Sequence, residues 1–260
     1  MLKNKSAIVT GSTSGIGLGV ARALAQAGAN VMLNGFGDAA FVAQLCRDLA
    51  AGSSGRVAYH PADVSRAKEA ATLVATAEQA FGAVDILVNN AGIQFVSPAE
   101  DFPEDRWDAV QDTILNSTFH TTKAALPGMK RRNWGRIVNV VSVHGLVASP
   151  FKSAYVAAKH GQIGLTKTVA LEVAETGITC NAVCPGYVLT PLVEGQVESQ
   201  AKAHNLPRDR VIREVILAAQ PSKRFVEVDD VAALVLFLCG DAAKSITGAA
   251  IPIDGGWTAR

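Results

Sequence analysis

The stretch S-A-I-V-T-G-S-T-S-G-I-G-L-G-V-A-R-A-L-A, residues 6–25, joins an apolar strand pattern to a helical pattern through a glycine-rich turn. Residues 6–10 are mostly apolar, as in a strand covered on both faces, and residues 15–27 repeat apolar positions at helical spacing. Glycine allows a tight turn between two such elements. The stretch therefore predicts a β-strand followed at once by an α-helix, the first step of an α/β fold.

Short apolar runs alternate with longer helical patterns along the rest of the chain. Strand patterns occur at residues 6–10, 30–34, 56–60, 84–89, 135–142, 178–184 and 249–253, and helical patterns include residues 15–27, 66–81, 104–131 and 153–175. Continuous apolar runs are typical of parallel strands. The alternation predicts an α/β protein with a doubly wound (Rossmann) parallel sheet of about seven strands and helices on both faces. No linker or repeat interrupts it, so we expect residues 1–260 to form a single domain.

Residues 187–222 depart from this alternation, because they contain two helical segments where one crossover helix would be enough. The break between the segments lies near residues 204–207. An insertion after the carboxyl end of a strand lies where ligands bind in open α/β sheets. We therefore predict that residues 187–222 form a helical lid over a substrate.

The composition is that of a globular protein, with 49% hydrophobic residues, 18% charged residues and a formal net charge of +1. This balance gives no electrostatic basis for binding nucleic acid or an anionic membrane. We find no signal peptide and no apolar run that could span a bilayer, and we expect a cytoplasmic location. The four cysteines form no C-x-x-C pair, so we predict free thiols and no metal site.

Gly11, Gly15 and Gly17 follow the first strand pattern with the spacing G-x-x-x-G-x-G. Glycines at such a turn let the backbone approach a pyrophosphate, while the free N–H groups and the positive end of the next helix bind its charge. A tight turn without a ligand is the alternative. The position after a strand and before a helix favours a dinucleotide-binding site.

The charge of the residues near the glycine turn and the second strand distinguishes NAD from NADP. A 2′-phosphate needs an Arg or Lys near the glycine turn or at the end of the second strand. Residues 11–46 hold one basic residue, Arg22, which lies well inside the first helical pattern. Asn34 and Gly35 end the second strand, and Asp38 is best explained as the N-cap of the next helix. The sequence therefore favours NAD over NADP.

Tyr155 and Lys159 stand four residues apart in a helical pattern, so they share one face of the helix. A packed tyrosine beside a lysine that extends to solvent would explain this spacing without any function. Two other polar stretches follow strand patterns. Asp63 could accept a hydrogen bond from an adenine amino group or could cap the next helix, and the small residues after Asn89 leave room for a ribose.

The motifs T-G-x-x-x-G-x-G (10–17), N-N-A-G (89–92), Ser142, Y-x-x-x-K (155–159) and C-P-G (184–186) occur together and in order. With them the whole chain resembles the short-chain dehydrogenase/reductase family. Within that family, S-T-S-G-I-G-L-G, N-N-A-G-I-Q, K-S-A-Y-V-A-A-K-H-G and D-G-G-W-T-A-R are most similar to bacterial enzymes that act on D-3-hydroxybutyrate. The resemblance implies an NAD-dependent oxidoreductase of ketone body metabolism that interconverts D-3-hydroxybutyrate and acetoacetate and assembles as a homotetramer.

The resemblance also implies roles for the residues of the catalytic set, Ser142, Tyr155 and Lys159. A free phenol has a pKa near 10, so Tyr155 needs a nearby positive charge to act as a base at neutral pH. Lys159 would lower the pKa of Tyr155, which would then take the proton of the substrate hydroxyl as hydride leaves. Ser142 would hold the reacting oxygen against Tyr155.

Two larger sets follow from the same resemblance. The predicted cofactor-binding residues are Gly11, Thr13, Ser14, Gly15, Ile16, Gly17, Phe36, Asp63, Val64, Asn90, Ala91, Gly92, Tyr155, Lys159, Pro185, Gly186, Val188, Thr190 and Leu192. The predicted substrate-binding residues are Gln94, Ser142, His144, Lys152, Tyr155, Tyr187, Gln196 and Trp257. Among these, Gln94, His144, Lys152 and Gln196 would bind the substrate carboxylate. Similar enzymes have Trp where this chain has Tyr187.

The chain departs from the family at Ile114, where the resemblance implies an Asn that bends the helix and relays protons through water. Asn116 lies two residues later, about 200° around an ideal helix, so it could replace that Asn only with a local distortion. Either the helix contains a bulge, or the proton leaves by another route, or turnover is impaired. We expect activity to be retained.

Two other functions stay open at this point. The chain could be a short-chain dehydrogenase for another small hydroxy acid, alcohol or sugar. Alternatively, it could be a protein that binds NAD without catalysis, which the Ile114 departure would permit.

Overall fold

The computed structural model describes residues 2–259, apart from the side chains of residues 191, 192, 196, 199 and 202–204. Within this range the strands form one seven-stranded parallel sheet in the order β3-β2-β1-β4-β5-β6-β7. The strands are β1 (Ser6–Val9), β2 (Asn30–Asn34), β3 (Val57–His60), β4 (Ile86–Asn89), β5 (Gly135–Val140), β6 (Ile178–Pro185) and β7 (Ala250–Ile253). The predicted doubly wound α/β sheet is confirmed.

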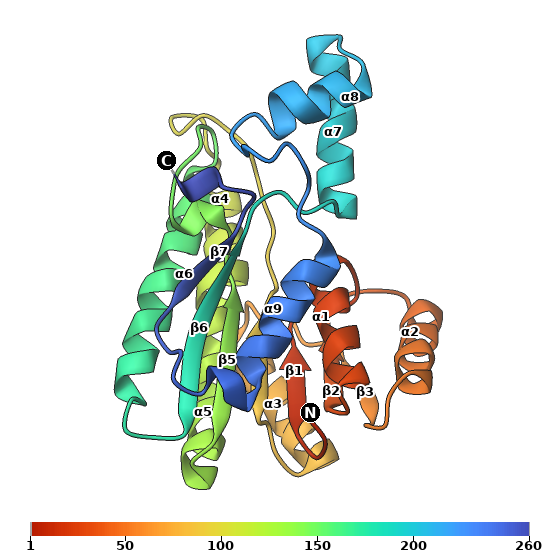
Figure 1. Cartoon of the computed structure of the whole chain (residues 1–260), viewed down its shortest axis with the longest axis vertical. Helices are drawn as coiled ribbons and strands as arrows, with labels where there is room; N and C mark the ends of the chain where they lie inside the picture. Colours follow the sequence, from red (N-terminus) through yellow and green to blue (C-terminus); the bar gives the residue numbers. More distant parts are fainter. Residues whose placement is uncertain (1, 260) are drawn as a thin grey trace.

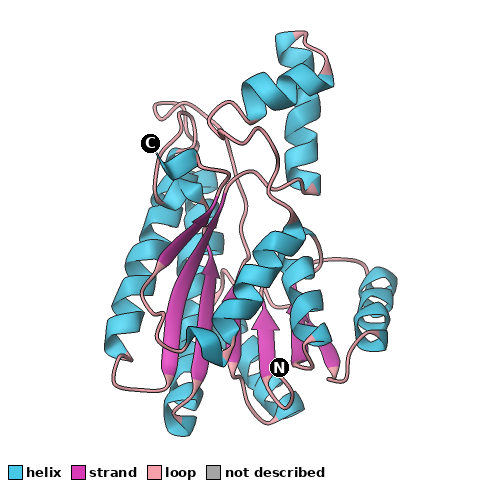
Figure 2. Cartoon of the chain, viewed as in Figure 1, coloured by secondary structure: helices cyan, strands magenta, loops and turns pink. Residues whose placement is uncertain are grey.

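Helices cover both faces of the sheet, as Figures 1 and 2 show. On one face α1 (Gly15–Gln26), α2 (Ala39–Ala51) and α9 (Val228–Cys239) pack on alternate strand residues such as Val9 and Leu33. On the other face α3 (Ala67–Phe81), α5 (Ser117–Arg132) and α6 (Ser153–Glu172) pack on residues such as Ile8 and Met32. The inner strands β1, β4, β5 and β6 are buried along their whole length, as their continuous apolar runs predict.

The strand order reverses between β1 and β4, and the segments that follow these two strands are hydrogen-bonded together. The Asn90 side-chain amide donates to the carbonyl oxygens of Thr10 and Gly11, at 3.0 Å each. The Thr10 hydroxyl oxygen accepts from the backbone N–H groups of Asn90 (2.9 Å) and Ala91 (3.0 Å). Ligands of open α/β sheets bind at such a reversal. We call these four hydrogen bonds the Thr10–Asn90 bracket; they position the segments that border the site.

The predicted helix over residues 104–131 is interrupted. Its first part is α4 (Glu104–Gln111), its second is α5, and between them a π-helical turn, η1, covers Asp112–Asn116. The Ser117 hydroxyl donates to the Thr113 carbonyl at 2.6 Å, and the Thr118 hydroxyl donates to the Ile114 carbonyl at 2.7 Å. Side chains that bond to carbonyls four residues back compete with the regular helical pattern. The bulge considered in the sequence analysis is therefore present.

The inserted segment stands above the carboxyl edge of the sheet (Figure 1) and consists of α7 (Pro191–His204), α8 (Arg208–Val211) and a π-helical turn, η3 (Ile212–Ile216). Its short helices have an apolar cluster of their own, formed by Val197, Val211, Ile216 and Leu217. Across residues 2–259, no helix combines the length and hydropathy that a bilayer span requires.

The glycine turn leads to a prediction about stability. A Cβ added at Gly17 would collide with the Gly11 carbonyl oxygen and the Asn90 amide, both of which are fixed by the bracket described above. We expect Gly17→Ala to lower the free energy of unfolding by about 1–3 kcal/mol in urea titrations. Gly195→Ala, in the exposed interior of α7 where an added Cβ meets nothing within 4 Å, should instead raise it by up to about 1 kcal/mol. Equal effects of the two variants would contradict this account.

Candidate active site

A groove of about 1140 Å³ runs along the carboxyl edge of the sheet. The ends of four neighbouring strands supply its walls, so residues far apart in sequence meet there. The predicted cofactor-binding residues that line it are Gly11, Thr13, Ser14, Gly15, Ile16, Phe36, Asp63, Val64, Asn90, Ala91, Gly92 and Thr190. The predicted residues thus meet in one groove, and their contact with a cofactor stays a prediction.

The glycine turn forms a cradle at one side of the groove. Gly11 and Gly15 have positive φ angles of +61° and +55°, which other residues rarely adopt. A Cβ at Gly11 would lie 3.0 Å from the Ala91 Cα. Ser14, the N-cap of α1, makes no side-chain capping bond, so it leaves the first N–H groups of the helix open to an anion. The cradle fits a pyrophosphate.

The end of β2 holds the residues on which the choice of NAD over NADP rests in the sequence analysis. Asn34 is buried, and its amide donates to the carbonyls of His60 (3.1 Å) and Ala62 (2.8 Å), which ties β2 to the end of β3. Asp38 accepts from the Phe41 N–H at 2.9 Å, which confirms it as the N-cap of α2. Phe36 is 72% exposed beside the groove. Asn34 thus has a structural role.

Asp63 lines the groove, but its carboxylate already has partners within its own turn. One oxygen accepts from the Ser65 hydroxyl at 2.6 Å, and the other lies 3.4 Å from the Arg66 guanidinium. The N-cap position of α3 belongs to Arg66, so Asp63 closes the turn before the helix without capping it.

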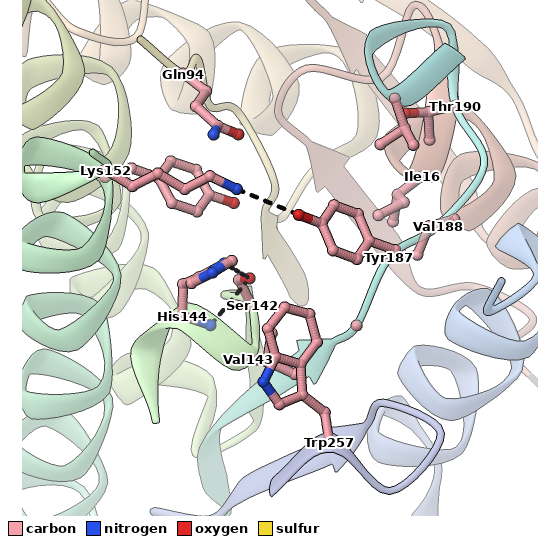
Figure 3. Close-up of a pocket in the computed structure, with 13 residues that line it drawn as sticks. Ile16, Gln94, Ser142, Val143, His144, Lys152, Tyr187, Val188, Thr190 and Trp257 are labelled. Carbon is pink, nitrogen blue, oxygen red and sulfur yellow. Dashed lines mark hydrogen bonds between the residues drawn. The ribbon is translucent and has the colours of Figure 1, made fainter. Parts of the chain in front are cut away.

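A smaller pocket of about 130 Å³ opens beside the groove (Figure 3). Both cavities share Ile16, Gln94 and Thr190, so a ligand in one can touch a ligand in the other. The lining residues are Ile16, Gln94, Ser142, Val143, His144, Lys152, Tyr155, Gly186, Tyr187, Val188, Thr190, Val193 and Trp257. Every described residue of the predicted substrate-binding set is among them.

Tyr155, Ser142 and Lys159 lie at one side of this pocket. Lys159 is buried behind Tyr155, with its Nζ 5.6 Å from the centre of the phenol ring. The same Nζ donates to the Val140 carbonyl at 2.9 Å. Ser142 follows β5 and forms a hydrogen bond with the Tyr155 phenol. The i, i+4 spacing on α6 thus brings an ammonium group close to the phenol, and the alternative of a lysine that extends to solvent is wrong.

The pKa of Tyr155 is raised, whereas the sequence analysis predicts that Lys159 lowers it. Burial raises the pKa of Tyr155 to about 12, and the hydrogen bond with Ser142 offsets only part of that shift. Burial also lowers the pKa of Lys159 to about 7. In the free protein, therefore, Lys159 does not make the phenol acidic, because desolvation outweighs the attraction between the two charged forms. A further positive charge is needed before Tyr155 can ionise near neutral pH.

His144 is neutral at physiological pH. Burial, together with the positive charges of Lys152 and His160, lowers the pKa of His144 to about 4. Its Nε2 lies 2.8 Å from the Ser149 hydroxyl and its Nδ1 lies 3.4 Å from the Ser142 hydroxyl. His144 therefore offers hydrogen bonds to the pocket and orients Ser142.

The pocket also carries a cation and an unpaired amide. The Lys152 ammonium donates to the Tyr187 hydroxyl at 3.4 Å, and Tyr187 stacks on Trp257 with ring centres 5.5 Å apart. The Gln94 Nε2 is buried and has no hydrogen-bond partner among residues 2–259. In Figure 3 the Gln94 amide points toward the Lys152 and Tyr187 pair. These donors suit a carboxylate.

Five predicted contacts lie elsewhere or cannot be placed. Gly17, Lys159 and Pro185 do not line either cavity; Gly17 lies under the glycine turn, and Pro185 is the last residue of β6. The contact of these three residues with a cofactor stays a prediction. The side chains of Leu192 and Gln196 lie outside the described part of the chain.

The sequence analysis missed one side of the groove. Asp105, Asp108 and Asp112, from α4 and η1, line the cavity. Their spacing of three and four residues places them on one helix face, which could have identified them as a set. Among residues 2–259, no group of His, Cys, Asp or Glu could hold a metal ion.

Ile114 occupies the place where the family resemblance implies an Asn. It is fully buried and packs with Ala154, Ala158 and Tyr155. Asn116 remains exposed, and its amide donates to the Asp112 carboxylate at 2.6 Å. The π-helical turn therefore does not bring Asn116 into the site.

Known proteins resemble this chain in sequence and in fold. A family profile described as enoyl-(acyl carrier protein) reductase matches residues 11–258. The chain belongs to the short-chain dehydrogenase/reductase family. This dehydrogenase superposes, with a TM-score of 0.90 and 35% identity over 99% of each chain, on a variant of the actinorhodin polyketide ketoreductase solved with NADPH. The family and the glycine cradle together indicate a nicotinamide cofactor.

Two relatives of this dehydrogenase are more similar in sequence. One, from Rhizobium meliloti, is named D-beta-hydroxybutyrate dehydrogenase and is 56% identical over 256 residues, covering 98% of this chain and 99% of the relative. Another of the same name, from Cupriavidus necator, is 56% identical over 261 residues and covers 100% of both chains.

The buried Lys159 leads to a prediction about pH dependence. A lysine of the unfolded chain titrates near 10.5 and Lys159 of the folded protein near 7, so between these values the unfolded chain binds more protons. Stability therefore rises with pH across this window. We expect the difference in melting temperature, Lys159→Met minus the parent, to be largest below pH 7 and to become smaller as the pH approaches 10.5.

The control for this comparison is Lys167→Met, at an exposed position of the same helix. A relative melting temperature of Lys159→Met that did not change between pH 6 and pH 10 would contradict the assignment. Despite any gain in stability, turnover should fall by about 100-fold or more.

Proposed function

We propose that this protein is an NAD-dependent dehydrogenase that interconverts D-3-hydroxybutyrate and acetoacetate, and so takes part in ketone body metabolism. The observation that carries the proposal is that two kinds of polar group line one small pocket. Tyr155 and Ser142 line it together with Lys152 and the unpaired Gln94 amide. A short hydroxy acid needs both pairs, one for its reacting oxygen and one for its carboxylate. The names of the two relatives at 56% identity support this substrate.

The groove would hold the cofactor, with its pyrophosphate on the glycine cradle. When bound, the cofactor accepts a hydride from the substrate carbon. NAD is favoured over NADP because the end of β2 presents Asn34, Gly35 and Phe36, none of which can neutralise a 2′-phosphate. The basic residue that does line the groove, Arg66, already lies near the carboxylates of Asp63 and Glu69.

Ser142 and Tyr155 bind the substrate hydroxyl group, and Tyr155 accepts its proton. Ser142 donates a hydrogen bond to the substrate oxygen and holds it beside Tyr155. As the alcohol is oxidised, its O–H bond breaks and the proton forms an O–H bond with the Tyr155 oxygen. Tyr155 can accept that proton only as a phenolate, so the positive charges of Lys159 and of the oxidised cofactor together must overcome the burial that raises its pKa.

The carboxylate side of the pocket sets the substrate class. Lys152 supplies a partly desolvated cation, since burial lowers its pKa, and Gln94 supplies an N–H donor. Tyr187 and Trp257 close the apolar wall. A volume of about 130 Å³ suits a short chain better than a long acyl group.

A homotetramer is proposed as well, following the family resemblance. Large apolar side chains on α5, α6 and α9 are exposed in the single chain, among them Phe119 (47%), Leu171 (79%) and Phe237 (43%). Exposed apolar groups of this size are typical of subunit contacts. Light scattering that gave the mass of a monomer would contradict this assembly.

The decisive experiment mixes the protein with NAD and D-3-hydroxybutyrate and follows the absorbance of the reduced cofactor. We expect turnover with the D enantiomer, little with the L enantiomer, and a kcat/KM at least about tenfold higher with NAD than with NADP, because no 2′-phosphate partner stands at β2. Faster turnover of neutral alcohols would indicate another short-chain dehydrogenase. No turnover beside tight NAD binding would indicate a non-catalytic protein.

Lys152 gives the test of the carboxylate site. We expect Lys152→Met to lower kcat/KM for D-3-hydroxybutyrate by about 10- to 100-fold, which corresponds to the loss of a charge-assisted hydrogen bond. For an uncharged analogue such as 2-butanol the loss should be less than about threefold, because that substrate has no carboxylate to pair. Equal losses on both substrates would remove Lys152 from the carboxylate site.

A further inference from the structure

Gln162 is a buried polar residue for which neither the fold nor the pocket gives a reason. It lies on the buried face of α6, one turn after Lys159, and it is 1% exposed. It lines neither the groove nor the pocket. Its Oε1 atom has no hydrogen-bond partner among the described residues. A buried acceptor without a partner is costly, so it indicates a function or a bound water.

The Gln162 amide contacts the π-helical turn at the point where the family Asn is missing. Its Nε2 donates to the Ile114 carbonyl at 3.2 Å and to the Thr118 hydroxyl at 2.7 Å. The Ile114 carbonyl also accepts from Thr118 at 2.7 Å. Because a carbonyl oxygen has only two lone pairs, these bonds leave it no capacity for a water. The open acceptor on this side of the site is Gln162 Oε1.

Lys159 has hydrogen-bond donors that lack an acceptor among the described residues. Its ammonium group carries three donors, and within residues 2–259 its Nζ makes one hydrogen bond, to the Val140 carbonyl. It is 3% exposed, so its other donors cannot reach bulk water directly. Residues three apart on a helix are neighbours, so Gln162 with its open acceptor and Lys159 with its open donors lie on the same face of α6.

A chain of buried hydrogen bonds ties the backbone at Gln162 to the sheet. The Gln162 backbone carbonyl accepts from the Thr166 hydroxyl at 2.7 Å, and the same hydroxyl accepts from the Asn139 amide at 2.8 Å. Asn139 in turn accepts from the Asn89 amide at 2.9 Å. All four residues are at most 3% exposed. The side chain itself is held by its two bonds to Ile114 and Thr118.

We propose that Gln162 is a positioning residue that binds a relay water between its Oε1 and the Lys159 ammonium, in place of the relay that the family Asn supplies. The inference rests on the proposed oxidation of a hydroxy acid. Each turnover releases the substrate hydroxyl proton to Tyr155. Lys159 gives an ammonium proton to the water, which passes a proton on to solvent, and the resulting amine then takes the proton of the Tyr155 O–H group, which restores the Tyr155 phenolate. Ile114 is tolerated because the polar group has moved from η1 to α6.

The test compares Gln162→Met with the parent in steady-state kinetics. Met has a similar volume, and Thr118 still bonds to the Ile114 carbonyl, so the variant should fold. We expect kcat to fall roughly tenfold, with an increased solvent isotope effect, as for a weakened proton transfer. The KM for D-3-hydroxybutyrate should stay unchanged, because Gln162 does not touch the pocket.

Two further variants separate the relay from a structural role. Ser117→Ala removes another donor to the Ile114 carbonyl, at 3.3 Å, and leaves both Gln162 contacts in place, so it should leave kcat within about twofold of the parent. Ile114→Asn in the Gln162→Met background should restore most of kcat, because it returns a polar group to the family position. An unchanged kcat in Gln162→Met, an equal loss in Ser117→Ala, or no recovery in the double variant would each overturn the proposal.

These outcomes are distinct from a failure of the proposed function. A parent protein that oxidises another alcohol but not D-3-hydroxybutyrate would overturn the substrate assignment, and the kcat ratio of Gln162→Met to the parent could still be measured on that alcohol. A ratio near one on any turned-over substrate would overturn the relay alone.

Discussion

The contact between the turn after β1 and the segment after β4 is the constraint on which the site depends. Asn90 fills the space beneath Gly11 and Gly17, and its amide donates to the backbone of the turn. The same bonds hold the reversal point of the sheet together, so fold and ligand cradle share one set of contacts. Thr10 therefore serves the site through its hydroxyl oxygen, which accepts from the backbone N–H groups of Asn90 and Ala91.

Burial controls the acid–base pair in a way that spacing alone did not reveal. The i, i+4 relation correctly placed Tyr155 and Lys159 together, and simple pairing of charges led to an acidic phenol. In the structure both groups are desolvated, which favours the neutral phenol and the neutral amine. The ionised state needed for alcohol oxidation thus depends on charge that arrives with the oxidised cofactor. Ionisation of the base is thereby coupled to occupancy of the groove.

Sequence reasoning succeeded where a signal was local and periodic. The strand and helix patterns, the Asp38 cap and the glycine turn were all read from short windows, and the structure contains them. It failed where the outcome depended on packing between distant elements. The role of Asn34 depends on the end of β3, the acidic row on α4 depends on which face turns to the groove, and the Gln162 amide depends on η1. The family resemblance supplied the pocket residues that spacing alone could not have grouped.

The inserted helices have one structural property with consequences for the evolution of this protein. Their apolar cluster is internal to the segment, and Tyr187 is the pocket residue that packs against it. Sequence drift within α7 and α8 is thus insulated from the folding of the sheet and reaches the ligand through Tyr187 and through Val193, which lines the pocket from α7. Lineages can diverge in the molecules they recognise while the nucleotide-binding half stays constant, which makes this segment a natural unit for exchange between related enzymes.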